Sequence, residues 1–368
     1  MTIRTPKRLA ATVLAVAVAA VPAAGASASA PPIGAPATVT LVTHDSFPTA
    51  DTTINDALDR FGAATGIDVE ILAAGDAGTM VTKAVLTAGN PEGDVLYGVD
   101  NTYLTRAVDG GVFEPYTADG LDAIPTELRA AIPADDSGDP AVTPIDYGDV
   151  CVNHDIAWFA ERDLEPPAGL ADLAEPEYAD LLVVQNPASS SPGLAFLLAT
   201  IAEFGDAGDG GGWEDYWSEL AANGVEVVDD WTGAYYERFS GTGGGDKPLV
   251  VSYGSSPPFE VIYADPPVDE PSTGAIASTC FRQIEYAGVL AGTDEPVAAR
   301  RLVDFLISEE FQAEIALNLF VFPVVDVPLP PEIERFSVIP DEPLALDPSD
   351  IAAHREDWIE TWTDLVLR

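Results

Sequence analysis

Three serines, Ser189, Ser190 and Ser191, stand directly before Pro192 and Gly193, where an apolar helix-like stretch begins. Proline is favoured at the first turn of a helix. Hydroxyl groups and free backbone amides at such a position can bind an anion or a polar ligand group. A simple cap on a surface helix would use the same residues, so this segment alone leaves both interpretations open.

Several aromatic side chains fall in polar segments at the ends of predicted strands. Aromatic faces in such places can enclose a flat ring or a cation. Core packing uses the same residue types, so each ring is open to both interpretations. The side chains are Trp231, Tyr235, Tyr236, Tyr253, Phe259, Phe320 and Phe322.

Known catalytic signatures are missing from the sequence. It contains no Gly-x-Ser-x-Gly elbow, no phosphate loop ending in Gly-Lys-Ser/Thr and no His-Glu-x-x-His motif. Three histidines, His44, His154 and His354, are few for acid–base chemistry or for a metal site. We therefore expect neither an enzyme nor a metal centre.

The chain is strongly acidic, with 61 acidic and 16 basic side chains in 368 residues and a formal charge of -45. Hydrophobic residues make up 47%, which is typical of a globular protein. A surface this negative repels nucleic-acid phosphates and anionic lipid headgroups, so nucleic acid is excluded as a partner. A cation is the more natural small ligand, although solubility alone would explain the same excess of charge.

Residues 1–30 have the pattern of a secretory signal. Arg4, Lys7 and Arg8 precede an uncharged apolar run from Leu9 to Val21, and small residues suited to cleavage follow. The run is shorter than the roughly 20 residues of a membrane-spanning helix. We therefore predict export to the periplasm or cell surface, and removal of the signal would take the charge to -48, because it holds three basic and no acidic residues.

Cys151 and Cys280 are the only cysteines of the chain. An isolated pair in an exported protein favours a disulfide, with two separate buried thiols as the alternative. The bond would close a loop of more than 100 residues. Chain-entropy estimates value such a cross-link at about 4–5 kcal/mol.

Strand-like and helix-like segments alternate near the start of the mature chain, which indicates βαβ units and a parallel sheet. In such sheets ligands bind beyond the carboxyl ends of strands. His44 with Asp45, and the segment 98–101 with Asp100, follow two strands and are expected to line a cleft. Strands are predicted at 37–43, 68–72, 94–97, 149–153, 181–184, 225–228, 249–253 and 274–285, and helices at 52–65, 79–88, 193–204, 213–222, 298–308, 309–317 and in the tail 347–368.

In these motifs the sequence resembles the periplasmic thiamine-binding proteins of ABC transporters, within the extracellular solute-binding superfamily. The resemblance runs from about residue 37 to 368, and it implies an α/β, two-lobed type II periplasmic-binding-protein fold with a ligand cleft between the lobes. The matching segments are 44–47, 98–101, 146–148, 189–194, 231–235, 249–253 with 256–257, 322–324 with 329–330, and 352–355 with Trp358.

The resemblance also implies ligand contacts. Trp231 and Phe320 would face the thiazolium ring of thiamine. His44 and Phe259 would flank the pyrimidine, whose polar edge would meet Asp76. The family usually has tyrosine at the positions of His44 and Phe259 and tryptophan at that of Phe320, so each position keeps a flat face while two hydroxyls are lost.

Other predicted binding residues are polar or aromatic side chains of the matching motifs. Ser190 and Ser191 would meet the hydroxyl or phosphate end of the ligand. The rest of the set is Asp45, Asp100, Tyr147, Tyr235 and Tyr253.

The resemblance also implies the bounds of two lobes. The first comprises residues 37–145 plus 282–318, and the second 146–281 plus 319–368. The chain would cross between the lobes at 146–148 and return at 283–285. Cys151 and Cys280 lie just beyond these two crossings, on the side of the second lobe, where a disulfide would join adjacent strands.

We therefore predict a monomeric exported protein that captures thiamine or a thiamine phosphate and delivers it to the permease of an ABC importer. Thiamine would be its transported ligand, and no cofactor is expected. A ferric-iron or polyamine-binding protein on the same scaffold is one alternative. A secreted thiamine-degrading enzyme, which would need a cysteine nucleophile, is another.

Overall fold

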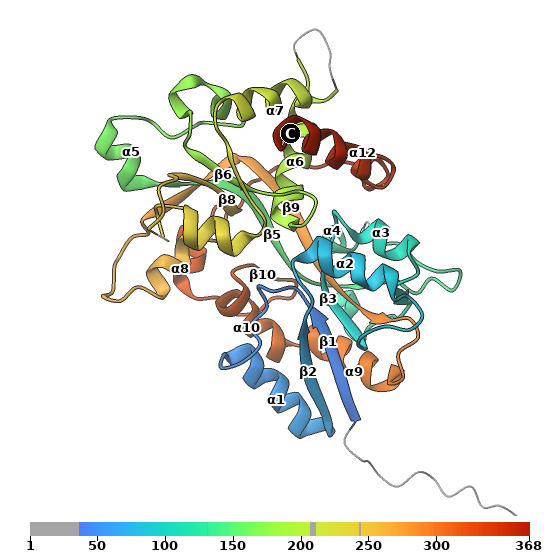
Figure 1. Ribbon diagram of the computed structural model, residues 1–368. Coiled ribbons are helices and arrows are strands. Elements are labelled where there is room, and N and C mark those ends of the chain that lie inside the picture. The colour runs from blue at the N-terminus through green and yellow to red at the C-terminus, as the bar shows by residue number, and fades with distance from the viewer. Residues whose placement is uncertain (1–36, 131, 207–210, 243) are drawn as a thin grey trace, which may run out of the picture. The chain divides into compact units, whose positions relative to one another are not determined.

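A computed structural model describes residues 37–130, 132–206, 211–242 and 244–368. The predicted signal at residues 1–30 lies outside these residues. A mixed ten-stranded sheet forms the centre of the described chain (Figure 1). Its strands are β1 (Ala37–Thr43), β2 (Ile67–Ala73), β3 (Val95–Asp100), β4 (Phe113–Glu114), β5 (Thr143–Asp155), β6 (Leu182–Gln185), β7 (Glu226–Val228), β8 (Leu249–Tyr253), β9 (Thr273–Leu290) and β10 (Phe322–Pro323).

Helices pack around this sheet, and no described helix is both long and apolar enough to cross a membrane. They are α1 (Thr53–Thr65), α2 (Ala77–Leu86), α3 (Leu104–Asp109), α4 (Thr126–Arg129), α5 (Ile156–Arg162), α6 (Ser191–Phe204), α7 (Trp213–Ala222), α8 (Pro257–Ile262), α9 (Pro296–Leu306), α10 (Glu309–Leu319), α11 (Pro331–Phe336) and α12 (Pro348–Val366), with single turns η1 (Leu121–Ala123), η2 (Ala171–Ala174), η3 (Pro176–Tyr178) and a wider turn η4 (Gly233–Arg238).

The order of the strands is β2-β1-β3-β9-β5-β8-β6-β7, with β4 paired to β9 and β10 to β5. β1, β2 and β3 are parallel, and so are β6, β7 and β8, as the βαβ pattern predicts. The two central strands, β5 and β9, are antiparallel to each other and to their outer neighbours. The sheet is therefore two parallel groups joined by a long antiparallel pair, which Figure 1 shows running between them.

One predicted boundary needs correction. The segment 98–100 lies inside β3 and does not follow it, because β3 continues to pair with β9 as far as Asp100 opposite Glu285. The register is irregular between Tyr97 and Val99, around Gly98, whose φ is 97°. A residue with a Cβ rarely adopts such a backbone, so glycine lets the strand bend and continue.

The tail of the chain adds to the core through α12. Trp362 is fully buried and packs edge-to-face against Trp217 of α7, with ring centroids 5.4 Å apart. An edge-to-face pair in a core is a favourable arrangement of two indoles. The helical tail predicted from the spacing of its apolar residues is thus confirmed, and Trp362 serves packing.

The predicted disulfide is confirmed between Cys151 in β5 and Cys280 in β9. It joins the two central strands across a sequence separation of 129 residues. The lobe boundaries stay a prediction, because one hydrophobic cluster takes in residues on both sides of them, such as Met80 and Leu194.

Candidate functional site

A small cavity of about 80 Å³, here called the inner pocket, lies at the point where several elements end or begin. β1 and β8 end beside it, while α2 and α6 begin there. Its lining residues are His44, Ser46, Asp76, Ala77, Ser191, Pro192, Trp231, Tyr253, Glu285, Asn318, Leu319, Phe320 and Val321.

His44 follows the last residue of β1 and lies directly against β3. A Cβ at Gly98 would stand 2.3 Å from His44 Cδ2, so only glycine leaves room for this imidazole. On its other side, His44 Nε2 lies 3.5 Å from Glu285 Oε2. Burial lowers the pKa of His44, but the carboxylates of Glu285, Asp76 and Asp146 together outweigh burial and raise that pKa above 6.5. His44 and Glu285 thus form a buried pair in which the carboxylate favours the protonated imidazole.

Asp76 stands at the start of α2, where its carboxylate accepts a hydrogen bond from the Ala77 amide at 2.6 Å. Burial raises the pKa of Asp76 to about 6. A cation in the pocket would favour the ionised carboxylate, since charge interactions are strong where water is excluded. Asp76 can therefore lose a proton when a cation enters.

Ser190 and Ser191 begin α6, a helix whose first eleven residues, Ser191–Ile201, are all buried. Both hydroxyl groups are buried, that of Ser190 beside the Asp76 carboxylate and that of Ser191 beside the Asp100 carboxylate, where each opposes the rise in the pKa of its neighbour. A simple cap on a surface helix would leave such hydroxyls exposed, so these buried serines fit a binding role better.

A buried hydrogen-bond network underlies the inner pocket. Gln283 Nε2 donates to Asp100 Oδ2 at 3.0 Å and to Glu285 Oε1 at 3.1 Å. Tyr253 donates its hydroxyl to Gln283 Oε1 at 3.0 Å. Gln283 of β9 therefore connects the end of β3 to the end of β8. It also contacts Glu285 from one side, while His44 contacts Glu285 from the other.

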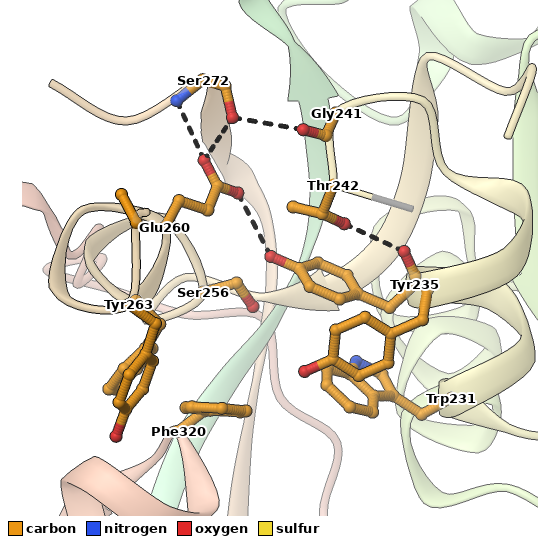
Figure 2. Close-up of a pocket in the computed structure, with 12 residues that line it drawn as sticks. Trp231, Tyr235, Gly241, Thr242, Ser256, Glu260, Tyr263, Ser272 and Phe320 are labelled. Atoms are coloured by element: carbon orange, nitrogen blue, oxygen red, sulfur yellow. Dashed lines mark hydrogen bonds between the residues drawn. The ribbon is translucent and has the colours of Figure 1, made fainter. Parts of the chain in front are cut away.

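A larger cavity of about 370 Å³, here called the outer chamber, adjoins the inner pocket, and Trp231 and Phe320 line both. Figure 2 shows the residues of the outer chamber. Trp231 stacks on Tyr235 with centroids 4.9 Å apart, and its Nε1 donates to Ser252 Oγ at 3.0 Å. Its centroid is 6.5 Å from that of Phe320. The other residues of the chamber are Tyr236, Gly241, Thr242, Ser256, Phe259, Glu260, Tyr263, Ala264 and Ser272.

The bacterial extracellular solute-binding protein family has a model that matches residues 90–341 of this chain. The chain belongs to this family. It is 27% identical over 338 residues to the thiamine-binding periplasmic protein of Escherichia coli strain K12, which covers 92% of this chain and 96% of that protein.

Solved structures agree with this assignment. A periplasmic thiamin binding protein superposes with a TM-score of 0.75 and 26% identity, covering 90% of this chain and 96% of that one. Iron-bound HitA from Pseudomonas aeruginosa reaches a TM-score of 0.65 at 20% identity, over 90% of this chain and 99% of that one, which shows the fold alone. The predicted fold class, the two-lobed type II fold of periplasmic binding proteins, is thus confirmed.

In this solute-binding protein the structure brings together most of the residues that the sequence singled out. Ser190 is buried next to Ser191 at the start of α6. Asp100 is buried in the network beneath the inner pocket. Predicted residues that line the inner pocket are His44, Asp76, Ser191, Trp231, Tyr253 and Phe320; those that line the outer chamber are Trp231, Tyr235, Phe259 and Phe320.

Asp45 and Tyr147 lie elsewhere. Asp45 is exposed and accepts a hydrogen bond from the Gly75 amide at 3.0 Å. Tyr147 lines a separate depression, where the guanidinium of Arg282 lies 5.4 Å from its ring centroid. Tyr147 follows Asp146, which accepts a hydrogen bond from the buried Tyr97. Because successive strand residues point to opposite faces, Tyr147 faces away from the side that Asp146 occupies.

Sequence reasoning missed several residues of the two cavities. Glu285 was assigned only to a chain crossing. Its place in the pocket depends on the pairing of β9 with β3, where it stands opposite Asp100. Asn318 precedes the predicted Phe320 by two residues and was overlooked. Tyr236 was among the aromatic candidates but not in the predicted binding set, and Glu260 and Tyr263 were not singled out by any motif.

Proposed function

We propose that this protein captures thiamine or a thiamine phosphate outside the cytoplasmic membrane and presents it to the permease of an ABC importer, without chemical change. Thiamine is its cargo, and no cofactor takes part. The observation that carries the proposal is the combination of Trp231 and Phe320 with the carboxylates of Asp76 and Glu285 around one pocket. The names of the relatives, which are thiamine-binding, support the same ligand.

The charges around the two cavities favour a cation. Asp76, Glu285 and Glu260 are their acidic lining residues. His44, which is paired with Glu285, also lines the inner pocket, and neither lysine nor arginine lines either cavity within the part of the chain that the structure describes. Aromatic faces add to the attraction, since a cation above a ring gains up to about 2 kcal/mol when water is excluded. Thiamine supplies a permanent cation in a flat ring, which fits both features.

The size of the inner pocket indicates that binding requires movement. Its volume of about 80 Å³ is below the roughly 300–1,000 Å³ of typical small-molecule sites. His44, Asp76 and Glu285 of this pocket belong to the first predicted lobe, whereas Trp231 and Phe320 belong to the second. Parting of the lobes would therefore enlarge the space between the carboxylates and the rings, and we expect this movement on ligand entry, as in hinge-bending proteins.

Ferric iron on the same scaffold finds less support. The Tyr235 hydroxyl donates to Glu260 at 3.3 Å, and its ring stacks on Trp231. Among the described residues, no group of three or more histidine, cysteine, aspartate or glutamate side chains converges to hold a metal ion. The cysteine pair is disulfide-bonded, so a thiol nucleophile for thiamine cleavage is not available in this state.

Calorimetric titration of the purified protein with thiamine, its mono- and diphosphates, ferric iron and spermidine tests the proposal. We expect a thiamine-class ligand to bind with a dissociation constant below about 10 µM, roughly -7 kcal/mol. Weaker binding of all three thiamine forms would reject the proposal. Tighter binding of iron, with tyrosinate absorption, or of spermidine would replace it by one of the alternatives.

A further inference from the structure

Tyr103, in the turn after β3, is fully buried although it lines neither the inner pocket nor the outer chamber. Its hydroxyl donates a hydrogen bond to the Pro187 carbonyl at 3.0 Å. Tyr103 belongs to the first predicted lobe, whereas Pro187, in the turn before α6, belongs to the second. The buried hydroxyl therefore joins the two predicted lobes outside both cavities.

A second contact lies beside the first, at Gly78 in the first turn of α2. The Gly78 amide donates to the Ser189 carbonyl at 2.9 Å, again from the first predicted lobe to the second. A Cβ at Gly78 would stand 2.8 Å from the carbonyl oxygens of Ala188 and Ser189 and 2.8 Å from the Tyr103 hydroxyl oxygen. Since ordinary contacts of carbon need about 3.5 Å or more, only glycine lets α2 approach this turn so closely.

The helix α12 adds a third contact from the second predicted lobe, beside α3 of the first (Figure 1). Arg355 of α12 is 5% exposed, and its guanidinium lies over the Tyr103 ring, 5.1 Å from the centroid. A cation over an aromatic face is attracted most strongly where water is excluded. Glu356 Oε1 lies 3.8 Å from Arg106 Nη1 of α3. The segment 352–355, which resembles the family but lines neither cavity, thus has a place at this contact.

These contacts oppose the parting of the predicted lobes. Opening would separate Tyr103 from Pro187 and Gly78 from Ser189, and it would bring a buried tyrosine ring into water. Loss of buried hydrogen bonds and exposure of apolar surface both cost free energy. None of these four residues lines the inner pocket or the outer chamber, so their contribution does not depend on contact with a ligand.

We propose that Tyr103 with Pro187, Gly78 with Ser189, and Arg355 form a latch that holds the two predicted lobes together both before and after a ligand binds. Because the latch stabilises the closed arrangement equally in both states, its opening controls how fast a ligand enters and leaves the inner pocket. The latch does not depend on which ligand the pocket takes.

Distances between spin labels on the two predicted lobes test the latch without any ligand. Both native cysteines form the disulfide, so labels attach at cysteines introduced at exposed positions, Asp59→Cys on α1 and Glu161→Cys on α5. Tyr103→Phe, which removes one hydroxyl, should raise the ratio of open to closed molecules about fivefold. Gly78→Ala, which adds a methyl group, should raise it further. A distance distribution unchanged in both variants, or a native protein that is mostly open, would overturn the proposal.

Tyr216→Phe is the matched control for Tyr103→Phe. Tyr216 is also buried, and its hydroxyl donates to the Leu170 carbonyl at 2.8 Å, but both of these residues belong to the second predicted lobe. The change should lower stability to urea as Tyr103→Phe does, while the label distances stay as in the native protein. Equal shifts of the distances in the two variants would assign the effect to general loosening of the fold and reject the latch.

Stopped-flow fluorescence with thiamine gives a second measurement, which rests on the proposed function. In Tyr103→Phe we expect the association and dissociation rates to rise together, by up to about fivefold, and the affinity to change less than about twofold. The loss of a direct ligand contact would instead act mainly on the dissociation rate. A rise in the dissociation rate alone would therefore overturn the latch. Failure of thiamine to bind would reject the proposed function and leave the distance test intact.

Discussion

The inner pocket and the outer chamber share Trp231 and Phe320 but differ in how their polar groups are satisfied. In the inner pocket the buried hydroxyls of Ser190 and Ser191 lie beside the carboxylates of Asp76 and Asp100. In the outer chamber the carboxylate of Glu260 accepts hydrogen bonds from the backbone amides of Ser272 and Thr273. The inner pocket thus offers a ligand closely spaced polar groups, and the outer chamber offers mainly aromatic surface.

The two regions also differ in how far apart their residues lie in the sequence. The inner pocket joins His44 with Glu285, whereas the outer chamber uses residues from Trp231 to Ser272 and adds Phe320. Movement of the two predicted lobes relative to each other would therefore change the inner pocket more than the outer chamber. The outer chamber should keep its shape while the inner pocket opens and closes.

The largest effect is expected from the disulfide. Its Cys280 lies in β9 between Thr273, which contacts Glu260 of the outer chamber, and Glu285, which contacts His44 of the inner pocket. Replacing Cys151 and Cys280 by alanine should lower the free energy of unfolding by about 4–5 kcal/mol, because a long loop in the unfolded chain is no longer closed. Urea denaturation of both forms measures this. A loss below about 1 kcal/mol would contradict the expectation.

Trp231→Ala should affect both regions, since this ring lines both. We expect thiamine to bind about 100-fold more weakly, or about 2.7 kcal/mol, from lost stacking and cation–π attraction. Trp231→Phe should recover part of this loss. Calorimetry with each variant measures the change, and an unchanged thiamine affinity in Trp231→Ala would reassign the ring to core packing.

Removing one carboxylate from each region sharpens the contrast. Asp76→Asn should weaken thiamine binding about tenfold, because a buried charge opposite the cation is lost. Glu260→Gln should change thiamine affinity less than about threefold, since Glu260 does not line the inner pocket. Parallel titrations of the two variants decide the matter, and the reverse order of effects would place thiamine in the outer chamber.

Thiamine binding should also depend on pH, because Asp76 titrates near the pH range in which binding is measured. Burial raises the pKa of Asp76 to about 6, so below pH 6 a bound cation must displace a proton. Affinity should therefore fall below pH 6 by up to about tenfold in total, the same loss as in Asp76→Asn. His44, with its pKa raised above 6.5 beside Glu285 despite the opposing effect of burial, becomes cationic on acidification and acts in the same direction.

The stability of the ligand-free protein should respond with the opposite sign. The folded state holds the protons of Asp76 and His44 more tightly than the unfolded chain does, so their contribution is complete at low pH. That of Asp76 is lost as pH rises from 3.8 to about 6, and that of His44 is lost as pH rises through its raised pKa.

Calorimetry of thiamine binding between pH 5 and 8, with Asp76→Asn as the control, checks the predicted pH dependence of affinity. An equal pH slope in that variant would assign the dependence to a group other than Asp76.

Local pattern was sufficient for most elements of the fold. The alternation of apolar residues predicts β1, and the serine-proline start of α6 predicts a helix that the structure begins at Ser191. These predictions hold because hydrogen bonding within a helix and the two faces of a strand depend on neighbours in sequence. The extension of β3 to Asp100 was missed, since it depends on pairing with β9.

The candidate site was predictable as a set of residue types and less so as a geometry. Aromatic and serine motifs led to Trp231, Phe320 and Ser191, which do line the inner pocket. Tyr147 belongs to the same kind of motif, yet it lies in another depression beside Arg282. Which face a strand residue occupies depends on register, and register is decided by partners far away in sequence.

By itself, the sequence determined the alternating elements, the cysteine pair and a surface whose charge favours cations. Only the tertiary structure decided that Glu285 stands 3.5 Å from His44, because β9 returns antiparallel to β3 and Gly98 leaves space for the imidazole. It also decided that Trp231 and Phe320 line two cavities. Contacts between distant segments depend on how whole elements pack, which no local pattern encodes.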